Sequence, residues 1–298
     1  MRNADHDRKK YGLLGRNISY SLSPAMHNAC FRHFGIPAEY GIFDVQGADN
    51  WNKYFTELVS GENVAGLNVT VPYKIEIHDM LKNMGKAHRL DDIAAYLGSV
   101  NTVKIENGEY TGYNTDGPGF YGSLIDDAGF DPAGKKVFIC GAGGAGRAIC
   151  MYLSYLEDKG PECIFIYDTD SATASRLEAD CAVKSEKIKC KAVKEDDIPD
   201  AMAGCGLAVN ATPLGTKPGD PDPLPVDRIK AGMVIYDLVY ARETGIIKSA
   251  RQKGARAVNG IGMLVNQGAL AFNIWTGCPV NETKKVMRAA LKNLPGGE

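Results

Sequence analysis

The strongest indication of fold in this chain is the stretch at residues 137–146, Val-Phe-Ile-Cys-Gly-Ala-Gly-Gly-Ala-Gly. Its apolar first four residues predict a buried strand, and the pattern at 147–157 predicts a helix directly after the glycines. Between strand and helix, a GxGxxG loop lets the backbone approach a pyrophosphate, whose charge lies at the helix N-terminus. The alternative is a merely tight turn, but strand, loop and helix all in order favour a dinucleotide site. Its predicted contacts are Gly141, Gly143, Gly144, Ala145 and Gly146.

The next predicted strand, 164–167, ends immediately before Asp168. An acid about 20 residues beyond the glycine loop binds the adenosine ribose hydroxyls in NAD enzymes. A carboxylate there repels a 2′-phosphate, and the nearest arginine downstream is Arg176. The alternative is that Asp168 only caps the helix expected near Ser171. We therefore predict NAD as the cofactor, with NADP as the less favoured alternative.

Strand-like and helix-like stretches alternate along nearly all 298 residues, which predicts an α/β protein with mostly parallel sheets. The length is about twice that of a typical ~150-residue domain. We expect a substrate-binding domain at 1–116, a Rossmann domain at 117–260, C-terminal helices at 261–298 returning to the first domain, and a cleft between the domains. Strands are predicted at 11–15, 38–45, 64–69, 99–105, 110–113, 137–140, 164–167, 208–210, 233–238 and 257–258. Helices are predicted at 23–35 (capped by Ser23), 49–60, 73–84, 88–96, 116–129, 147–157, from 171, and from 262 onward.

Composition excludes several classes of protein. With 34 basic and 36 acidic side chains the net charge is −2, so neither nucleic acid nor an anionic membrane is expected as a partner. No apolar run approaches the ~20 residues that span a bilayer, and the polar first ten residues resemble no secretory signal. We expect a cytoplasmic monomer or homodimer acting on a small molecule. The eight cysteines form no CxxC or zinc spacing and the five histidines no ligand pair, so free thiols and no metal are predicted.

Polar side chains also gather at predicted strand ends in the first third of the chain. Asn68 and Thr70 alternate along one strand end and so face the same way, with Lys74 about one helical turn further on. The segments Gly-Ser-Val-Asn-Thr at 98–102 and Gly-Tyr-Asn-Thr-Asp at 112–116 add similar groups. A patch of this kind suits a small polyhydroxylated acid.

With these motifs in place, the sequence closely resembles the shikimate dehydrogenase family. The resemblance extends over nearly the whole chain, from SLSPAMHN at 21–28 through GLNVTVPYK at 66–74 to NATPLG at 210–215, YDLVY at 236–240 and GMLVNQGA at 262–269. It implies reversible hydride transfer between a nicotinamide cofactor and the 3-position of shikimate or 3-dehydroshikimate. It also implies that Lys74 and Asp116 are the catalytic acid–base pair. A cation at the ketone oxygen would stabilise developing negative charge and deliver a proton.

The same resemblance implies the remaining site residues. Around the substrate it places Ser21, Ser23, Asn68, Thr70, Asn101, Tyr240 and Gln267. Around the cofactor it places Asn210, Ala211, Thr212, Gly260 and Met263.

Three positions depart from the family pattern. Tyr167-Asp168-Thr169 stands where NADP-using members carry Asn-Arg-Thr, Thr216 replaces a usual Met, and Ala241-Arg242 replaces a usual Asn-Pro. Four alternatives remain open: an NADP-linked biosynthetic enzyme, a quinate/shikimate dehydrogenase, a methylenetetrahydrofolate dehydrogenase and a non-catalytic dinucleotide sensor. The third lacks the motifs at 21–24 and 114–116, and the presence of both Lys74 and Asp116 disfavours the fourth.

Overall fold

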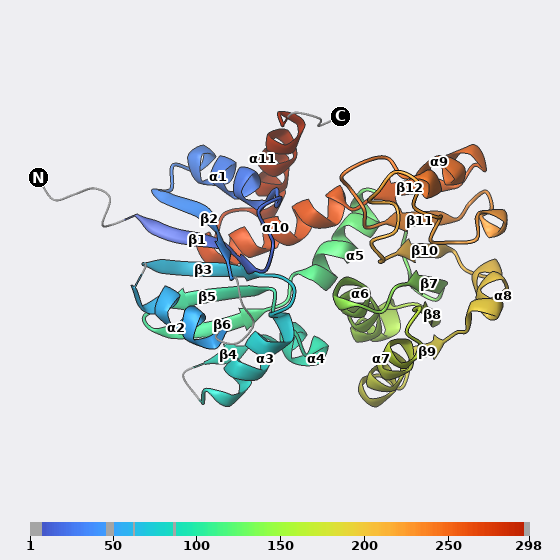
Figure 1. Cartoon of the computed structure of the whole chain (residues 1–298), viewed down its shortest axis with the longest axis horizontal. Helices are drawn as coiled ribbons and strands as arrows, with labels where there is room; N and C mark the ends of the chain where they lie inside the picture. Colours follow the sequence, from blue (N-terminus) through green and yellow to red (C-terminus); the bar gives the residue numbers. More distant parts are fainter. Residues whose placement is uncertain (1–7, 46–50, 62, 86–87, 295–298) are drawn as a thin grey trace, which may run out of the picture. The chain divides into compact units, whose positions relative to one another are not determined.

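The computed structural model describes residues 8–45, 51–61, 63–85 and 88–294. The chain divides into two compact units, one containing Met1–Thr115 and Val265–Glu298, the other Asp116–Leu264. The mixed α/β fold predicted from the sequence is confirmed in both (Figure 1). Within the described part of the chain, no helix has the length and apolarity to cross a membrane.

The first unit is built on a six-stranded sheet of order β2-β1-β3-β5-β6-β4. The pairs β1–β2, β1–β3 and β4–β6 are parallel, whereas β3–β5 and β5–β6 are antiparallel. Its core contains Leu14, Leu67, Ile77 and Val103, all at most 1% exposed. The strands are β1 Lys9–Gly15, β2 Ala38–Asp44, β3 Val64–Val69, β4 Arg89–Leu90, β5 Thr102–Glu106 and β6 Glu109–Tyr113.

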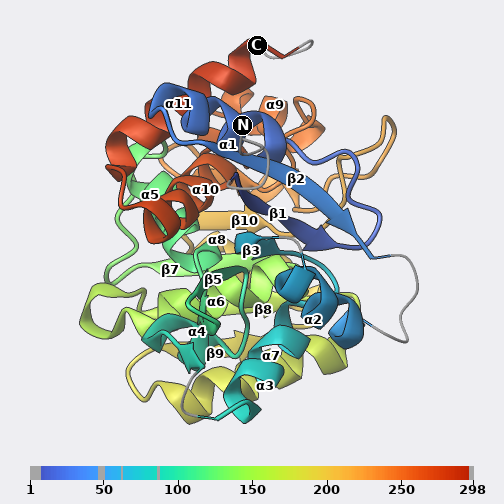
Figure 2. The ribbon, with the colours of Figure 1, turned by 90° about the vertical axis from the view of Figure 1, so that its left-hand side faces the viewer.

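Helices from both ends of the chain cover this sheet. Figures 1 and 2 show α1 and α11 side by side near β1 and β2, although they lie far apart in sequence. The indole Nε1 of Trp275, on α10, donates to the carbonyl oxygen of Val103 at 3.0 Å, which ties the C-terminal segment to β5. The helices are α1 Ser23–His33, α2 Trp51–Gly61, α3 Lys74–Asn83, α4 Asp92–Leu97, α10 Ile261–Thr276 and α11 Val280–Lys292.

The second unit holds a fully parallel six-stranded sheet of order β12-β11-β10-β7-β8-β9. This is the doubly wound order, in which successive strands are added first on one side of β7 and then, from β10 onward, on its other side. The strands are β7 Lys136–Cys140, β8 Cys163–Tyr167, β9 Lys189–Ala192, β10 Leu207–Asn210, β11 Val234–Asp237 and β12 Arg256–Asn259. The helices are α5 Asp116–Asp126, α6 Gly144–Tyr155, α7 Ser171–Lys184, α8 Ile198–Ala203 and α9 Gly245–Gln252.

Several predicted details were wrong. The segment expected as one helix at 88–96 is strand β4 followed by α4, because Arg89–Leu90 pairs with β6 and Asp91 caps the helix at Ala94. Ser23 is not the cap of α1, since it is the first helical residue and its N–H donates to Ser21 Oγ at 3.2 Å. Neither β9 nor α8 was predicted. The expected start of a helix at 49 and the chain end at 295–298 lie outside the described residues.

Candidate active site

The predicted cofactor residues meet at the carboxyl edge of the second sheet. Cys140 on β7 is in register with Tyr167 on β8 and with Asn210 on β10. The residues that follow these strand ends are joined directly: Gly141 N donates to Tyr167 O, and Ala211 N to Cys140 O, each at 2.7 Å. Neighbouring parallel strands therefore place the glycine loop, Asp168 and Ala211 at one switch point of the sheet, where such folds bind dinucleotides.

The glycine loop fits a pyrophosphate. Gly141 has φ +101°, and a Cβ at Gly146 would collide with the carbonyl oxygen of Gly141, so both positions require glycine. An added Cβ at Gly143 or Gly144 would meet no described atom within 4 Å, which leaves that side of the loop open. Helix α6 begins at Gly144, and its N-cap, Gly143, provides no side-chain hydrogen bond. Backbone N–H groups at this helix start are thus oriented for an anion.

Asp168 closes the loop from the neighbouring strand end. Its Oδ2 accepts a hydrogen bond from Ala142 N at 2.7 Å, and its Oδ1 accepts from Asp170 N at 2.9 Å. Asp170, not Asp168, caps α7 by accepting from Ala172 N. Because Asp170 caps α7, Asp168 does not have the helix-capping role considered as its alternative. Its carboxylate is instead fixed against the glycine loop, with lone pairs left for further donors.

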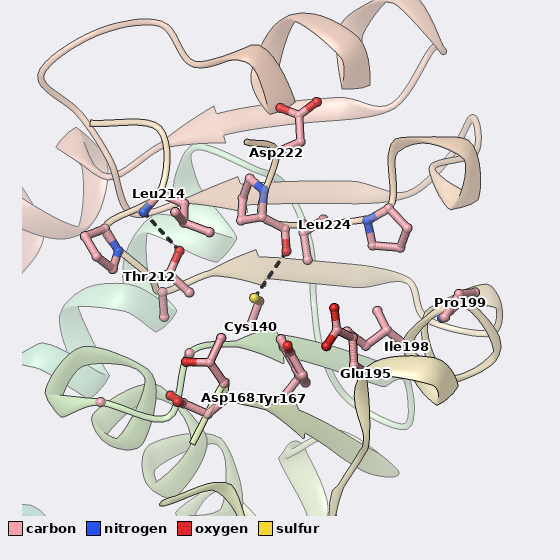
Figure 3. A pocket seen from close by; sticks show the side chains of 17 residues that line it. Cys140, Tyr167, Asp168, Glu195, Ile198, Pro199, Thr212, Leu214, Asp222 and Leu224 are labelled. Atoms are coloured by element: carbon pink, nitrogen blue, oxygen red, sulfur yellow. Dashed lines mark hydrogen bonds between the residues drawn. The ribbon is translucent and has the colours of Figure 1, made fainter. Parts of the chain in front are cut away.

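A cavity of about 660 Å³ adjoins this carboxylate (Figure 3). Asp168, Glu195 and Asp222 contribute three carboxylates to its wall, and none of its described lining residues is basic. Apolar residues, among them Ile198 and Leu224, form other parts of the lining. A volume of this size accommodates a nucleoside, and the described part of the wall carries no basic side chain to offset a phosphate.

Asn210 holds the loop that follows β10 in place by hydrogen bonds from a buried position. It is fully buried, and its Nδ2 donates to Asp237 Oδ1 at 2.8 Å and to Leu214 O at 3.1 Å. Its Oδ1 accepts from both the N–H and the hydroxyl of Thr212, at 3.0 and 2.6 Å. Thr244 donates to the other oxygen of Asp237 at 2.6 Å. Asn210 therefore shapes the loop after β10, whereas Ala211 and Thr212 line the cavity itself.

In the first unit, the predicted substrate residues Asn68 and Asn101 join one buried network. Asn68 Oδ1 accepts from the hydroxyl of Tyr40 at 2.8 Å, and its Nδ2 donates to Thr102 Oγ1 at 3.0 Å. Thr102 Oγ1 in turn donates to Asn101 Oδ1 at 3.1 Å. Asn68 and Asn101 are only 5% and 2% exposed, so both amides are held rigidly at the strand ends. Thr102 belongs to the polar segment 98–102 indicated by the sequence, whereas Tyr40 is a part of this network that the sequence did not indicate.

Two adjacent residues anchor the segments that carry Lys74 and Asp116. Val100 N donates to the carbonyl oxygen of Lys74 at 2.9 Å, at the first residue of α3. Asn101 Oδ1 accepts from Thr115 N at 2.8 Å, and Asn101 Nδ2 donates to Thr115 Oγ1 at 3.0 Å. Asp116 follows Thr115 and begins α5; it is 7% exposed, whereas Lys74 is half-buried. The first residue of α3 and the residue that precedes Asp116 are thus both hydrogen-bonded to the same short segment.

Ser21 and Ser23 lie next to each other at the start of α1. The Ser21 hydroxyl donates to Ser23 Oγ at 3.2 Å; Ser21 is half-buried and Ser23 is 6% exposed. His27, one turn on, is fully buried and stacks on Tyr40 with 4.4 Å between ring centroids. Burial lowers the pKa of His27 to about 3, so the ring packs as a neutral group.

The other predicted residues are distributed over both units. Thr70 follows β3, and Gln267 lies on α10 in the first unit; both are half-buried. Tyr240 and Met263 belong to the second unit, as does Gly260, where a Cβ would collide with the carbonyl oxygen of Leu238. Of the departures from the family pattern, Thr216 donates to Pro213 O at 2.8 Å and so closes its own turn. Ala241 and Arg242 are exposed.

Part of the cavity wall escaped the sequence analysis. The residues concerned come from the 3-10 helix Glu195–Asp197, from the start of α8 and from the proline-rich loop 213–225. The repeated prolines of that loop were the available signal, because they stiffen a segment without placing it in a helix or strand. The missed residues are Glu195, Ile198, Pro199, Asp222, Pro223, Leu224 and Pro225.

Comparison with known proteins gives one consistent result. Residues 13–103 match the family model "Shikimate dehydrogenase substrate binding domain", and residues 260–292 match "Shikimate 5'-dehydrogenase C-terminal domain". A Methanopyrus kandleri protein named shikimate dehydrogenase (NADP(+)) is 36% identical over 295 residues, covering 96% of each chain. Shikimate 5-dehydrogenase from Listeria monocytogenes, solved with shikimate and NAD, superposes with a TM-score of 0.82 at 32% identity, covering 94% of this chain and 96% of that one. Quinate dehydrogenase from Corynebacterium glutamicum, solved with NAD, gives 0.80 at 29% identity, covering 95% and 99%.

The doubly wound sheet, its glycine loop and these relatives define an NAD(P)-dependent oxidoreductase that acts on a CH–OH group. Within that class, the chain belongs to the shikimate dehydrogenase family. The family resemblance found in the sequence is thereby confirmed. The name of the Methanopyrus relative specifies NADP, against the NAD expected from Asp168.

Proposed function

We propose that this protein interconverts shikimate and 3-dehydroshikimate, favours NAD over NADP, and uses Lys74 and Asp116 as its acid–base pair. Family membership and the glycine loop support the reaction. The preference for NAD goes beyond the relatives, and one observation carries it: the carboxylate of Asp168, held by Ala142 N and Asp170 N in a cavity wall with no described basic residue.

The residues present fit a dinucleotide. Gly143 and Gly144 leave open space at the start of α6 for the pyrophosphate. The cavity beside Asp168 suits the adenosine, whose ribose hydroxyls can both donate to the carboxylate. A 2′-phosphate would bring nearly two negative charges to the same place. The Methanopyrus kandleri relative is named for NADP, so the proposed preference for NAD is the part of the proposal that differs from that relative.

The bound nicotinamide supplies or accepts the hydride; the chain's own residues handle the proton. In ketone reduction, the Lys74 ammonium stabilises the negative charge that develops on the substrate oxygen and donates a proton to it. Asp116 orients that ammonium and shares its proton, and both act in reverse during oxidation. Val100 N donates to the carbonyl oxygen of Lys74, and Asn101 holds Thr115, the residue before Asp116; both contacts support this assignment, because proton transfer requires groups in defined positions.

For the substrate, we propose that Ser21 and Ser23 receive the carboxylate, while Thr70, Gln267 and the Asn68–Asn101 network receive ring hydroxyls. The contact between the two serine hydroxyls forms a compact donor pair suited to a carboxylate. Quinate is the second candidate substrate, because a solved relative is a quinate dehydrogenase in complex with NAD.

The test is the oxidation of shikimate, followed by the absorbance of reduced nicotinamide, in wild type and in two variants. Lys74→Ala and Asp116→Asn should each lower kcat by about 10²–10⁴-fold, the usual share of a general acid–base group. Binding of NAD to the free protein should stay unchanged in both. Near-wild-type turnover in Lys74→Ala would exclude the proposed pair, and no turnover of shikimate or quinate by folded wild type would exclude the reaction.

A further inference from the structure

Three cysteines far apart in sequence meet inside the second unit. Cys150 lies on α6, Cys181 on α7 and Cys190 on β9. All three sulfurs lie within 4.8 Å of one another, with Cys150 Sγ 3.6 Å from Cys181 Sγ and 3.9 Å from Cys190 Sγ. Cys150 and Cys181 are fully buried and Cys190 is half-buried. We refer to these three residues as the thiol cluster.

The spacing of the sulfurs matches a metal site better than a disulfide. A thiolate binds zinc at about 2.3 Å, which puts sulfurs around one ion about 3.8–4.0 Å apart. Two of the three separations, 3.6 and 3.9 Å, are already close to that value, and the third is within 4.8 Å. A disulfide needs about 2.05 Å, so two packed elements would have to approach by about 1.5 Å. An ion could therefore enter with little movement of α6, α7 or β9.

The donors around the cluster are soft. Besides the three thiols, the thioether Sδ of Met151 lies 3.5 Å from Cys181 Sγ. Sulfur donors of these two kinds select thiophilic cations over Mg²⁺ or Ca²⁺. Within the described residues, no His, Asp or Glu belongs to this group of ligands. The site is thus built from sulfur alone.

The charge at the cluster also suits a cation. The guanidinium of Arg147 is close enough to interact electrostatically with Cys181. Arg147 Nη1 is itself held by Asp180 Oδ2 at 2.5 Å. A guanidinium at this position offsets the excess negative charge of a metal–thiolate complex.

We propose that the thiol cluster is a binding site for one thiophilic d¹⁰ cation of the Cu⁺, Zn²⁺ and Cd²⁺ class. Each thiol that binds releases its proton to solvent, and the ion joins α6, α7 and β9. Because α6 also carries the glycine loop at its start, the site would stabilise the element on which dinucleotide binding depends.

The test uses the reduced, metal-free full chain titrated anaerobically with Cd²⁺, and separately with Zn²⁺ and with chelator-buffered Cu⁺. We expect one ion per chain by native mass spectrometry, thiolate-to-metal charge-transfer absorption with Cd²⁺, and a rise in Tm of at least about 4 °C. The three arms rank the cations by affinity. Absence of binding in all three arms would overturn the proposal.

Single variants locate the site. Cys181→Ser, and Cys190→Ser at the half-buried and therefore more tolerant position, should each weaken Cd²⁺ binding at least about 100-fold. The matched control is Cys205→Ser, a buried thiol of the same unit that donates to Ala201 O and lies outside the cluster. It should bind Cd²⁺ as wild type does. Equal loss in the control, or full binding by a Cys190→Ser protein that still binds NAD, would refute the assignment.

Discussion

The substitution Asp168→Asn removes one negative charge from the cofactor cavity while keeping the size of the side chain. The wild-type carboxylate is fixed by Ala142 N at 2.7 Å and Asp170 N at 2.9 Å, so it cannot easily turn away from an incoming phosphate. At ~4 Å and an effective dielectric constant near 20, each pair of charges repels by about 4 kcal/mol. Because Asp168 is half-buried, solvent removes much of this energy. A remaining repulsion of ~1.4 kcal/mol still corresponds to a tenfold difference in kcat/KM between the two cofactors.

We therefore expect Asp168→Asn to raise kcat/KM for NADP about tenfold. It should lower kcat/KM for NAD several-fold, since ribose hydroxyls lose a charged acceptor. The assay is the initial rate of shikimate oxidation at saturating shikimate, with NAD or NADP varied. Glu195→Gln and Asp222→Asn are matched controls, because they remove the other two carboxylates of the cavity wall and should have much smaller effects. If the NADP parameters of Asp168→Asn equal those of wild type, the reasoning is refuted.

Three further predictions concern the loop, its support and the first unit. Gly146→Ala should abolish dinucleotide binding, measured by calorimetry, because the added Cβ collides with backbone of the loop. Gly143→Ala should fold normally and only weaken that binding, because its Cβ meets open space. Equal affinities of the two variants would contradict the loop geometry. Asn210→Ala should lower the free energy of unfolding in urea by about 1–3 kcal/mol and raise KM for the dinucleotide, because Asp237 and Thr212 lose a buried partner; unchanged stability would count against this network. Burial lowers the pKa of His27 from 6.5 to about 3, so unfolding takes up a proton at pH values between these two. The contribution of His27 to the free energy of unfolding is therefore complete above pH 6.5. Below that pH it falls by up to about 1.4 kcal/mol per pH unit. His27→Phe should flatten that part of the pH profile in urea titrations, and an unaltered slope would contradict the buried neutral ring.

Local signals predicted the centre of the second unit well. The apolar run of β7, the glycines and the start of α6 are contiguous in sequence, so their geometry follows from neighbouring residues. Strand β9 was missed because lysines alternate in it with Cys190 and Ala192, so the segment has no apolar run. Such lysines are typical of a strand at the edge of a sheet, where β9 lies. Strand β4 has only two residues and exists through its pairing with β6, which no local pattern specifies.

In the functional sites, too, only residues placed by local sequence could be predicted. Asp168 could be predicted because its offset from the glycine loop is fixed by one βαβ unit. The support of Asn210 by Asp237 depends instead on the register of β10 with β11, and the thiol cluster on the packing of α6, α7 and β9. Such contacts join residues distant in sequence, so cysteines whose spacing fits no metal motif still come together in space.

The most direct test of the central claim is a four-way comparison of kcat/KM on the unmodified protein, with shikimate and quinate each combined with NAD and NADP. The account predicts the highest value for shikimate with NAD, at least about tenfold above shikimate with NADP. Equal values with the two cofactors, or a preference for NADP, would contradict the role assigned to Asp168. A higher value for quinate than for shikimate would contradict the proposed substrate.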